Sequence, residues 1–229
     1  AIFLISYALF NVARKEFNIN LNQAKYFAGH SLGEYSALST AGYLNFSDTI
    51  KLLRKRGDAM QNAVPKGEGG MIAVLGSTVE KLEKIIEDNK KDFSAEIAND
   101  NSDGQIVLSG KNNDLDNLAI VLKSNSIKNI RLPVSAPFHC KLMSKATDIM
   151  KDEIQKLNFV EGNTKLVSNV TAKEIDNKDD LKKLLVDQIE NRVRWRESVI
   201  NMIENGVNHF IEIGPGKVLS GLVKRINKN

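Results

Sequence analysis

The spacing of apolar and polar positions alternates between helical and strand periods along most of the chain. Apolar residues three and four apart predict helices, and short apolar runs bounded by turn residues predict strands. We expect helices over residues 2–17, 79–89, 115–124, 142–157, 180–188, 197–205 and 218–226, and one that starts at Ser47 as its N-cap. We expect strands over residues 71–75, 94–98, 105–109, 127–132, 165–170 and 209–214, with a short β-prone run at 25–29.

The order of these elements predicts an α/β protein in two parts. Residues 67–133 read β-α-β-β-α-β after a turn-rich break at "PKGEGG", which is the ferredoxin-like arrangement. We therefore expect an inserted ferredoxin-like subdomain over 67–133. The flanking residues 1–66 and 134–229 alternate strands with helices, which predicts one main domain with a mainly parallel sheet.

The segment "GHSLG" is the first candidate for chemistry, because Ser31 lies between two glycines where the β-prone run turns into a helix. A nucleophilic serine needs such a sharp strand-to-helix turn, and glycines two residues away on either side let the backbone pack closely. The helix N-terminus offers backbone N–H groups, Leu32 among them, to an oxyanion. The alternative is a structural turn without catalytic work.

A serine nucleophile needs a base, and the chain has three histidines. His139 is the best candidate, since it lies in an irregular loop between the expected insert and the main domain; the alternative is a buried structural histidine. His30 should help to shape the site, and His209 should have a packing or surface role. Glu212 and Asp187 are conceivable third members of a triad, but a Ser-His dyad oriented by a backbone carbonyl or amide serves equally.

Arg56 lies on the flank of the apolar face of the helix after Ser47. An arginine on a helix is normally a solvated charge. If its guanidinium reaches a cleft instead, bidentate pairing would let a serine enzyme select substrates with a free carboxylate.

Composition narrows the classes of function. The 229 residues carry 32 basic and 28 acidic side chains, a net charge of +4, and 42% are hydrophobic. This mild basic excess suits an acidic protein partner but not nucleic acid, because no basic stretch is interleaved with aromatics. Cys140 is the single cysteine, which favours a reducing, cytoplasmic location. The apolar start "AIFLISYALF" is too short to span a bilayer, so we expect a buried helix and no membrane partner.

The chain resembles the malonyl-CoA:acyl-carrier-protein transacylase family and the related acyltransferase domains of polyketide and fatty-acid synthases. The resemblance covers essentially the whole chain and is carried by blocks in the family's order: "GHSLGEYSAL", "RKRGDAMQNAVPKGEGGMIAVLG", "NDNSDGQIVLSG", "LPVSAPFHCKLM", "VSNVTA", "VRWRESV" and "EIGPGKVLSGL". It implies a hydrolase-like α/β main domain with a ferredoxin-like insert. It also implies transfer of malonyl from malonyl-CoA to the phosphopantetheine thiol of acyl carrier protein, without a permanent cofactor or metal, by a monomer.

The resemblance implies roles for single residues. Ser31 corresponds to the nucleophile and His139 to the base, and Arg56 to the residue that holds the malonyl carboxylate. Gln188 corresponds to a glutamine whose backbone carbonyl orients the histidine. Two further residues are expected to contact substrate: Phe138, whose pairing with the histidine goes with a preference for malonyl over methylmalonyl, and Met60.

Three departures from the family pattern leave alternatives open. We expect the chain to start past the family's first strand and its "GQGSQ"-type loop, which supplies an oxyanion glutamine. Asp103 and Arg192 each stand where the family usually has proline. The alternatives are a serine esterase or thioesterase, or an inactive fragment that docks the carrier protein.

Overall fold

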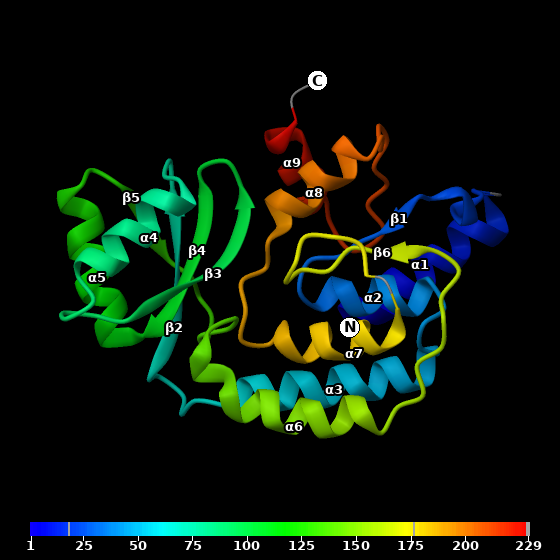
Figure 1. The fold of residues 1–229 in the computed structure, drawn as a ribbon, viewed down its shortest axis with the longest axis horizontal. Coiled ribbons are helices and arrows are strands. Elements are labelled where there is room, and N and C mark those ends of the chain that lie inside the picture. The colour runs from blue at the N-terminus through cyan, green and yellow to red at the C-terminus, as the bar shows by residue number, and fades with distance from the viewer. Residues whose placement is uncertain (18, 176, 228–229) are drawn as a thin grey trace.

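The computed structural model describes residues 1–17, 19–175 and 177–227, which form two units side by side (Figure 1). The first unit is a four-stranded antiparallel sheet with two helices. Its elements are β2 (Gly69–Leu75), α4 (Val79–Asp88), β3 (Ala95–Ser102), β4 (Gln105–Lys111), α5 (Asn112–Ser124) and β5 (Lys128–Arg131). The strands lie in the order β3-β4-β2-β5.

The two faces of this sheet have different partners, as the alternation of side chains along a strand requires. Ile72 and Leu108 face the helices, where they join a buried cluster with Leu82, Leu115 and others from α4 and α5. On the opposite face a smaller cluster of Met71, Ala98 and Val107 packs against Leu132 and Phe138. The second face therefore supports the loop that carries His139.

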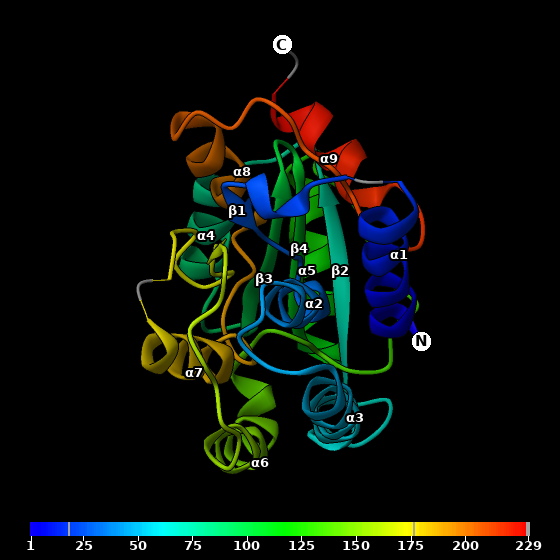
Figure 2. The same ribbon diagram turned by 90° about the vertical axis from the view of Figure 1, so that its right-hand side faces the viewer.

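The second unit is mainly helical around a short parallel pair of strands. Its elements are α1 (Ile2–Glu16), β1 (Tyr26–Phe27), α2 (Leu32–Thr40), α3 (Phe46–Asn62), α6 (Ser144–Gln155), β6 (Lys165–Leu166), α7 (Lys178–Asp187), α8 (Trp195–Glu204) and α9 (Val218–Ile226), with 3-10 turns η1 (Leu21–Gln23) and η2 (Lys141–Met143). β1 pairs with β6 in parallel. Both views show α3 and α6 side by side (Figures 1 and 2), and their apolar residues share one core with α2 and α7.

The mixed α/β class predicted from the sequence is confirmed, but several elements differ. The helix expected at the start of the chain is present as α1, but it is not buried: only Phe3, Ser6 and Phe10 are covered, and five of its large apolar side chains are exposed. The strand expected over 165–170 is limited to β6, and the one expected over 209–214 is wrong, because that segment is in neither a helix nor a strand. Its Glu212 carboxylate accepts hydrogen bonds from the backbone N–H groups of Leu219 and Ser220, at 3.1 and 2.7 Å, and so caps α9. The segment therefore supplies a cap for α9 through Glu212 and does not pair in a sheet.

The expected N-cap of α3 is also wrong. The helix begins at Phe46, and the side chain of Asn45 accepts the N–H of Asp48 at 2.9 Å. Ser47 lies inside the first turn instead. Asn and Ser are nearly equal as N-caps, so local preference alone does not decide between two candidates that lie two residues apart.

The two units are joined by backbone pairing and by one buried ion pair. Val193 donates its N–H to the carbonyl of Ala98 at 2.8 Å and accepts the N–H of Asp100 at 2.9 Å. The Asp100 carboxylate, which is fully buried, accepts from the Arg196 Nε at 3.0 Å on both oxygens. These contacts attach β3 to the chain that leads from α7 into α8.

The turn from β1 into α2 brings two backbone segments into close approach. A Cβ added at Gly29 would lie 2.1 Å from the carbonyl carbon and oxygen of Gly33, whereas one added at Gly33 would meet nothing within 4 Å. The backbone at Ser31 has a φ of 52° and a ψ of −106°. Glycine is therefore required at the first position by packing, and the second glycine has no such steric reason.

No helix in the three described ranges is long and apolar enough to cross a membrane.

The ion pair between the units yields a test of stability. We expect Arg196→Ala to lower the free energy of unfolding by about 2–4 kcal/mol, because it leaves the carboxylate of Asp100 buried without its cation. Asp100→Ala should be less harmful, since the Arg196 side chain is 24% exposed and can turn to water. Urea denaturation measures both variants. Asp103→Ala is the matched control, because the carboxylate of Asp103 is 74% exposed and lies 3.8 Å from Arg196. A smaller loss for Arg196→Ala than for Asp100→Ala would contradict this account.

The turn yields a second test. We expect Gly29→Ala to destabilise the protein by about 3 kcal/mol or more, because its Cβ would clash with backbone that cannot move aside. Gly33→Ala is the matched control: it adds the same methyl group in the first turn of α2 and should change stability by at most about 1 kcal/mol. Thermal unfolding followed by circular dichroism compares the two. Equal losses would show that the close approach at Gly29 does not matter.

Candidate active site

The hydroxyl of Ser31 lies between a histidine and an arginine. Ser31 Oγ is 2.7 Å from His139 Nε2, and Arg56 Nη2 donates to the same oxygen at 3.1 Å. Ser31 occupies the N-cap of α2, His139 belongs to the loop before η2, and Arg56 lies in α3. Three distant segments of the chain therefore meet at one oxygen atom.

A backbone carbonyl on the side of the ring away from Ser31 sets the orientation of His139. His139 Nδ1 is 2.8 Å from the carbonyl oxygen of Gln188, which can only accept, so Nδ1 carries the proton. Nε2 then presents its lone pair to Ser31 Oγ–H. Burial, together with the positive charge of Arg56, lowers the pKa of His139 to about 3. The imidazole is therefore neutral over the whole physiological range and can accept a proton from Ser31.

Arg56 is a buried cation, not the solvated charge that is usual on a helix. Its side chain is 6% exposed, and its guanidinium carbon lies 5.3 Å from the centre of the Tyr35 ring. Nη2 also donates to the side-chain oxygen of Gln188 at 2.9 Å. Within the described part of the chain, Arg56 Nε is buried without a hydrogen-bond partner. A buried, partly unpaired guanidinium beside a serine can receive an anionic group.

Neither acid considered as a third triad member contacts His139. Glu212 caps α9, and Asp187 pairs with Lys183 at 2.7 Å on the exposed side of α7. The group at His139 Nδ1 is the backbone carbonyl of Gln188. The geometry is therefore that of a dyad with a carbonyl behind the histidine.

The other predicted site residues have different surroundings. Leu32 is the first residue of α2, where a backbone N–H has no partner inside the helix. Phe138 is partly buried between the two units, and its carbonyl accepts from Ser109 Oγ at 2.6 Å, which ties the His139 loop to β4. Met60 lies in the core of the helical unit and is 3% exposed. Its predicted contact with substrate would have to form one helical turn beyond Arg56.

The two remaining histidines are apart from the Ser31 hydroxyl. His30 Nε2 is 2.8 Å from the side-chain oxygen of Asn101, and its ring lies 5.9 Å from that of Trp195. His30 thus helps to hold the turn against the antiparallel unit, and its role in shaping the site stays a prediction. His209 is exposed.

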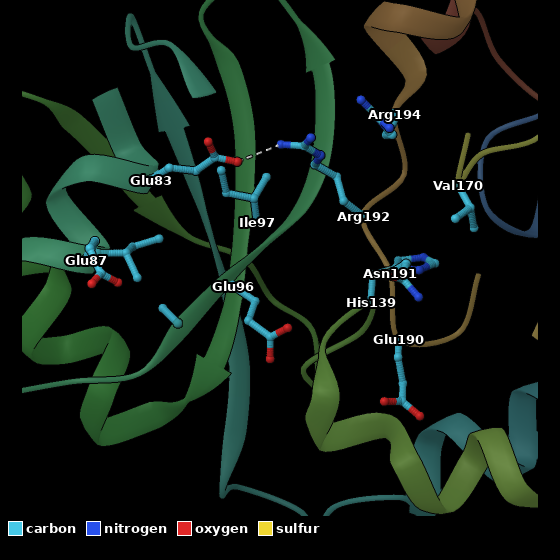
Figure 3. A pocket seen from close by; sticks show the side chains of 12 residues that line it. Glu83, Glu87, Glu96, Ile97, His139, Val170, Glu190, Asn191, Arg192 and Arg194 are labelled. Carbon is cyan, nitrogen blue, oxygen red and sulfur yellow. Dashed lines mark hydrogen bonds and ion pairs between the residues drawn. The ribbon is translucent and has the colours of Figure 1, made fainter. Parts of the chain in front are cut away.

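A cavity of about 430 Å³ lies between the two units, with His139 in its wall (Figure 3). Glu96 and Ile97 of β3 line one side, and Asn191, Arg192 and Arg194 line the other. The Arg192 guanidinium pairs with Glu83 of α4 at 3.2 Å across the cavity, as the dashed line in Figure 3 marks. Among the described residues no group of three or more His, Cys, Asp and Glu side chains could hold a metal ion.

Two buried polar residues that sequence reasoning did not single out also surround Ser31. Asn169 accepts the N–H of Ser31 on its side-chain oxygen at 2.7 Å and donates to the carbonyl of Gly29 at 2.8 Å. Glu34 is 1% exposed and contacts Gln188 and Asn169. Both residues lie in sequence blocks already noted, but a glutamate on a helix and an asparagine after a strand are ordinarily solvated. Only the packing of the elements shows that they are internal.

Comparison with known proteins identifies the family. The model of the acyl transferase domain matches residues 1–228. A malonyl CoA-acyl carrier protein transacylase of Bacillus subtilis is 43% identical over 203 residues, which are 88% of this chain and 64% of that protein. The crystal structure of an acyl-carrier-protein-S-malonyltransferase from Bartonella henselae superposes with a TM-score of 0.94 at 42% identity, covering 99% of this chain and 72% of the other.

A second similar structure is a malonyl-transacylase in complex with its type II PKS acyl-carrier protein, with a TM-score of 0.93 and 35% identity over 99% of this chain and 72% of that one. The chain spans less than two thirds of the length of the Bacillus subtilis relative. With a family model over nearly all its residues, the chain belongs to the acyl transferase domain family, among relatives named malonyl CoA-acyl carrier protein transacylases.

Proposed function

We propose that this chain carries the site that transfers a malonyl group from malonyl-CoA to the phosphopantetheine thiol of an acyl carrier protein, through an ester on Ser31. The observation that supports it most directly is the meeting of His139 Nε2 and Arg56 Nη2 at Ser31 Oγ, at 2.7 and 3.1 Å. One group can take the proton of the hydroxyl, and the other can bind a carboxylate on the acyl group. The names of the relatives supply the substrates.

The first half of the reaction loads the serine. His139 Nε2 takes the hydroxyl proton as Ser31 Oγ attacks the thioester carbonyl carbon of malonyl-CoA. The N–H of Leu32 at the start of α2 stabilises the oxyanion of the tetrahedral intermediate. When the carbon–sulfur bond breaks, the proton on His139 passes to the sulfur of coenzyme A, and malonyl-Ser31 remains.

The second half transfers the malonyl group from Ser31 to the carrier protein, with His139 again moving the proton. The thiol of the carrier protein gives its proton to His139, and its sulfur attacks the ester carbonyl. The bond to Ser31 Oγ breaks, and the oxygen takes the proton back from His139. Coenzyme A leaves before the carrier thiol attacks, so the mechanism is ping-pong. Gln188 takes part through its carbonyl, which keeps Nδ1 protonated and Nε2 free.

Arg56 selects the acyl group and keeps it in place. The free carboxylate of malonate would pair with the guanidinium, whose Nε has no other partner among the described residues. A charge-assisted pair in a buried site is stronger than in water, so an acyl group without a carboxylate is disfavoured. Phe138 and Met60 remain predicted contacts of the acyl group beside it.

The two units support the division of the chain that its sequence predicts. We infer a ferredoxin-like insert over 67–133, supported by the order β2-α4-β3-β4-α5-β5, and a hydrolase-like main domain over 1–66 and 134–229. The cavity between the two units, with His139 in its wall, would admit the phosphopantetheine arm of either substrate.

Labelling with radioactive malonyl-CoA tests the proposal. The protein should take up one malonyl group that is stable to gel filtration and is released by a carrier-protein thiol. Ser31→Ala should abolish labelling because the attacking oxygen is gone, while Ser47→Ala, an exposed serine at the start of α3, should label normally. Circular dichroism controls for folding. Absence of label in the unchanged protein, or persistent label in Ser31→Ala, would reject the malonyl-serine intermediate.

Removal of Arg56 separates malonyl transfer from esterase chemistry. We expect Arg56→Ala to lower kcat/KM for malonyl transfer by about 100- to 1,000-fold, as loss of a buried charge pair does. Transfer of a neutral acetyl group should fall by less than about tenfold, because no carboxylate needs a partner. Arg54→Ala, on the same helix but 82% exposed, is the matched control. Equal losses for the two acyl groups would favour a serine esterase or thioesterase.

A further inference from the structure

The carboxylate of Glu34, three residues after Ser31, is buried and accepts a hydrogen bond on each oxygen. Glu34 is in the first turn of α2, and its side chain is 1% exposed. Oε2 accepts from the side-chain nitrogen of Gln188 at 2.5 Å, and Oε1 accepts from the backbone N–H of Asn169 at 3.3 Å. Each oxygen thus faces a donor on a different segment. The mechanism above makes no use of this buried acid.

Through Gln188, Glu34 reaches both Arg56 and Ser31. The Gln188 amide presents its oxygen to Arg56 at 2.9 Å and its nitrogen to the carbonyl of Ser31 at 3.0 Å as well as to Glu34. A reversed amide would set donor against donor at Arg56 and acceptor against acceptor at the other two contacts. The carboxylate therefore helps to determine which way the amide points, and with it where Arg56 donates.

Through Asn169, Glu34 reaches the peptide of Ser31 by a second route. The Asn169 side chain bonds the N–H of Ser31 and the carbonyl of Gly29, so it holds the turn on both sides of His30. The Asn169 backbone is itself held by Glu34. Two connections, one through Gln188 and one through Asn169, lead from one carboxylate to Ser31, and the two side chains also contact each other at 3.5 Å.

We propose that ionised Glu34 is a positioning residue that holds the Gln188 amide and Asn169 in place and so sets the reactivity of Ser31. This inference rests on the proposed function for the identity of the acyl donor, but not for the reactivity of the serine. An ionised carboxylate is needed because both oxygens must accept. A protonated acid or a glutamine would turn one hydrogen-bearing group toward a donor.

The surroundings of Glu34 bring its pKa close to neutral pH. Burial raises the pKa of Glu34 to about 7, although the hydrogen bonds from Gln188 and Asn169 and the charge of Arg56 oppose the rise. The other titratable groups around it are His139, with its pKa lowered to about 3, and Tyr35 on the same helix, with its pKa raised to about 12. Arg56 stays charged throughout. Below pH 7 Glu34 takes up a proton and loses one acceptor, so Ser31 should become less reactive as the pH falls.

The test is the rate of Ser31 acylation between about pH 5.5 and 8.5, with two probes. Single-turnover loading from malonyl-CoA follows the proposed reaction, and inactivation by phenylmethanesulfonyl fluoride reports serine reactivity without a carboxylate or a carrier. In the unchanged protein both rates should fall about tenfold per pH unit below about pH 7. Glu34→Gln should be slower by about 10- to 100-fold at pH 8 and flat across the range, since it cannot titrate.

Two variants complete the design. Glu34→Asp keeps an ionisable carboxylate, so it should regain a pH-dependent rate even where Glu34→Gln folds poorly. Glu204→Gln removes an exposed carboxylate at the end of α8 and should match the unchanged protein. A purely structural role would change thermal stability without changing the shape of the pH profile.

The outcomes separate this inference from the proposed function. If Glu34→Gln keeps the rate and pH profile of the unchanged protein, the positioning role is overturned while malonyl labelling still stands. If malonyl-CoA fails to label but sulfonyl fluoride inactivation shows a Glu34-dependent fall below pH 7, the positioning role is supported and the malonyl donor is rejected. A flat profile for both probes in the unchanged protein overturns the role directly.

Discussion

The position of Gln188 is the constraint on which the rest of the site depends. Its backbone carbonyl orients His139, and its side-chain amide joins Arg56 to the peptide of Ser31. The residue is fully buried, so each of these polar contacts replaces one with water and is expensive to lose. Because Gln188 follows α7 directly, the packing of that helix against α6 determines where all three groups meet.

Local patterns predict this fold where a segment has one clear period, and they fail where a segment is short. In the antiparallel unit the helices and strands lie within a few residues of their predicted bounds, because each has a strong amphipathic pattern and turn residues on both sides. The run 209–214 has the alternation of a strand, yet its Glu212 is used to cap α9. A period of two indicates an extended chain, but not whether a neighbouring strand pairs with it.

In the candidate site, too, residue chemistry alone suggests some of the residues, whereas others are recognised only from the packing of the elements. Ser31 and His139 could be selected from the chain, because nucleophiles and bases are few and the turn around "GHSLG" is distinctive. Arg56 was suggested by its place on the flank of an apolar helix face, but only as an alternative to a solvated charge, and Gln188 rested on the family resemblance alone, since nothing local marks a glutamine as buried. Glu34 escaped notice for the same reason. Whether a charged side chain is buried depends on how several elements pack together, so it cannot be predicted from a short segment of the sequence.

Ser31 and His139 are two of the four non-glycine residues in the described chain with a positive φ, beside Ser126 and Ala172. Ser31 has a φ of 52° and His139 a φ of 59°, a backbone region that residues other than glycine rarely adopt. Each such residue costs about 1–3 kcal/mol and persists only where its surroundings enforce it. At Ser31 that support comes from Asn169 and from the close approach of Gly29, and at His139 from Gln188 and from Ser109 through the carbonyl of Phe138. One support belongs to the antiparallel unit and the others to the helical unit. The geometry of the Ser31–His139 pair is therefore a property of the junction, and the contacts that join β3 to the chain before α8 support this pair as well as the fold.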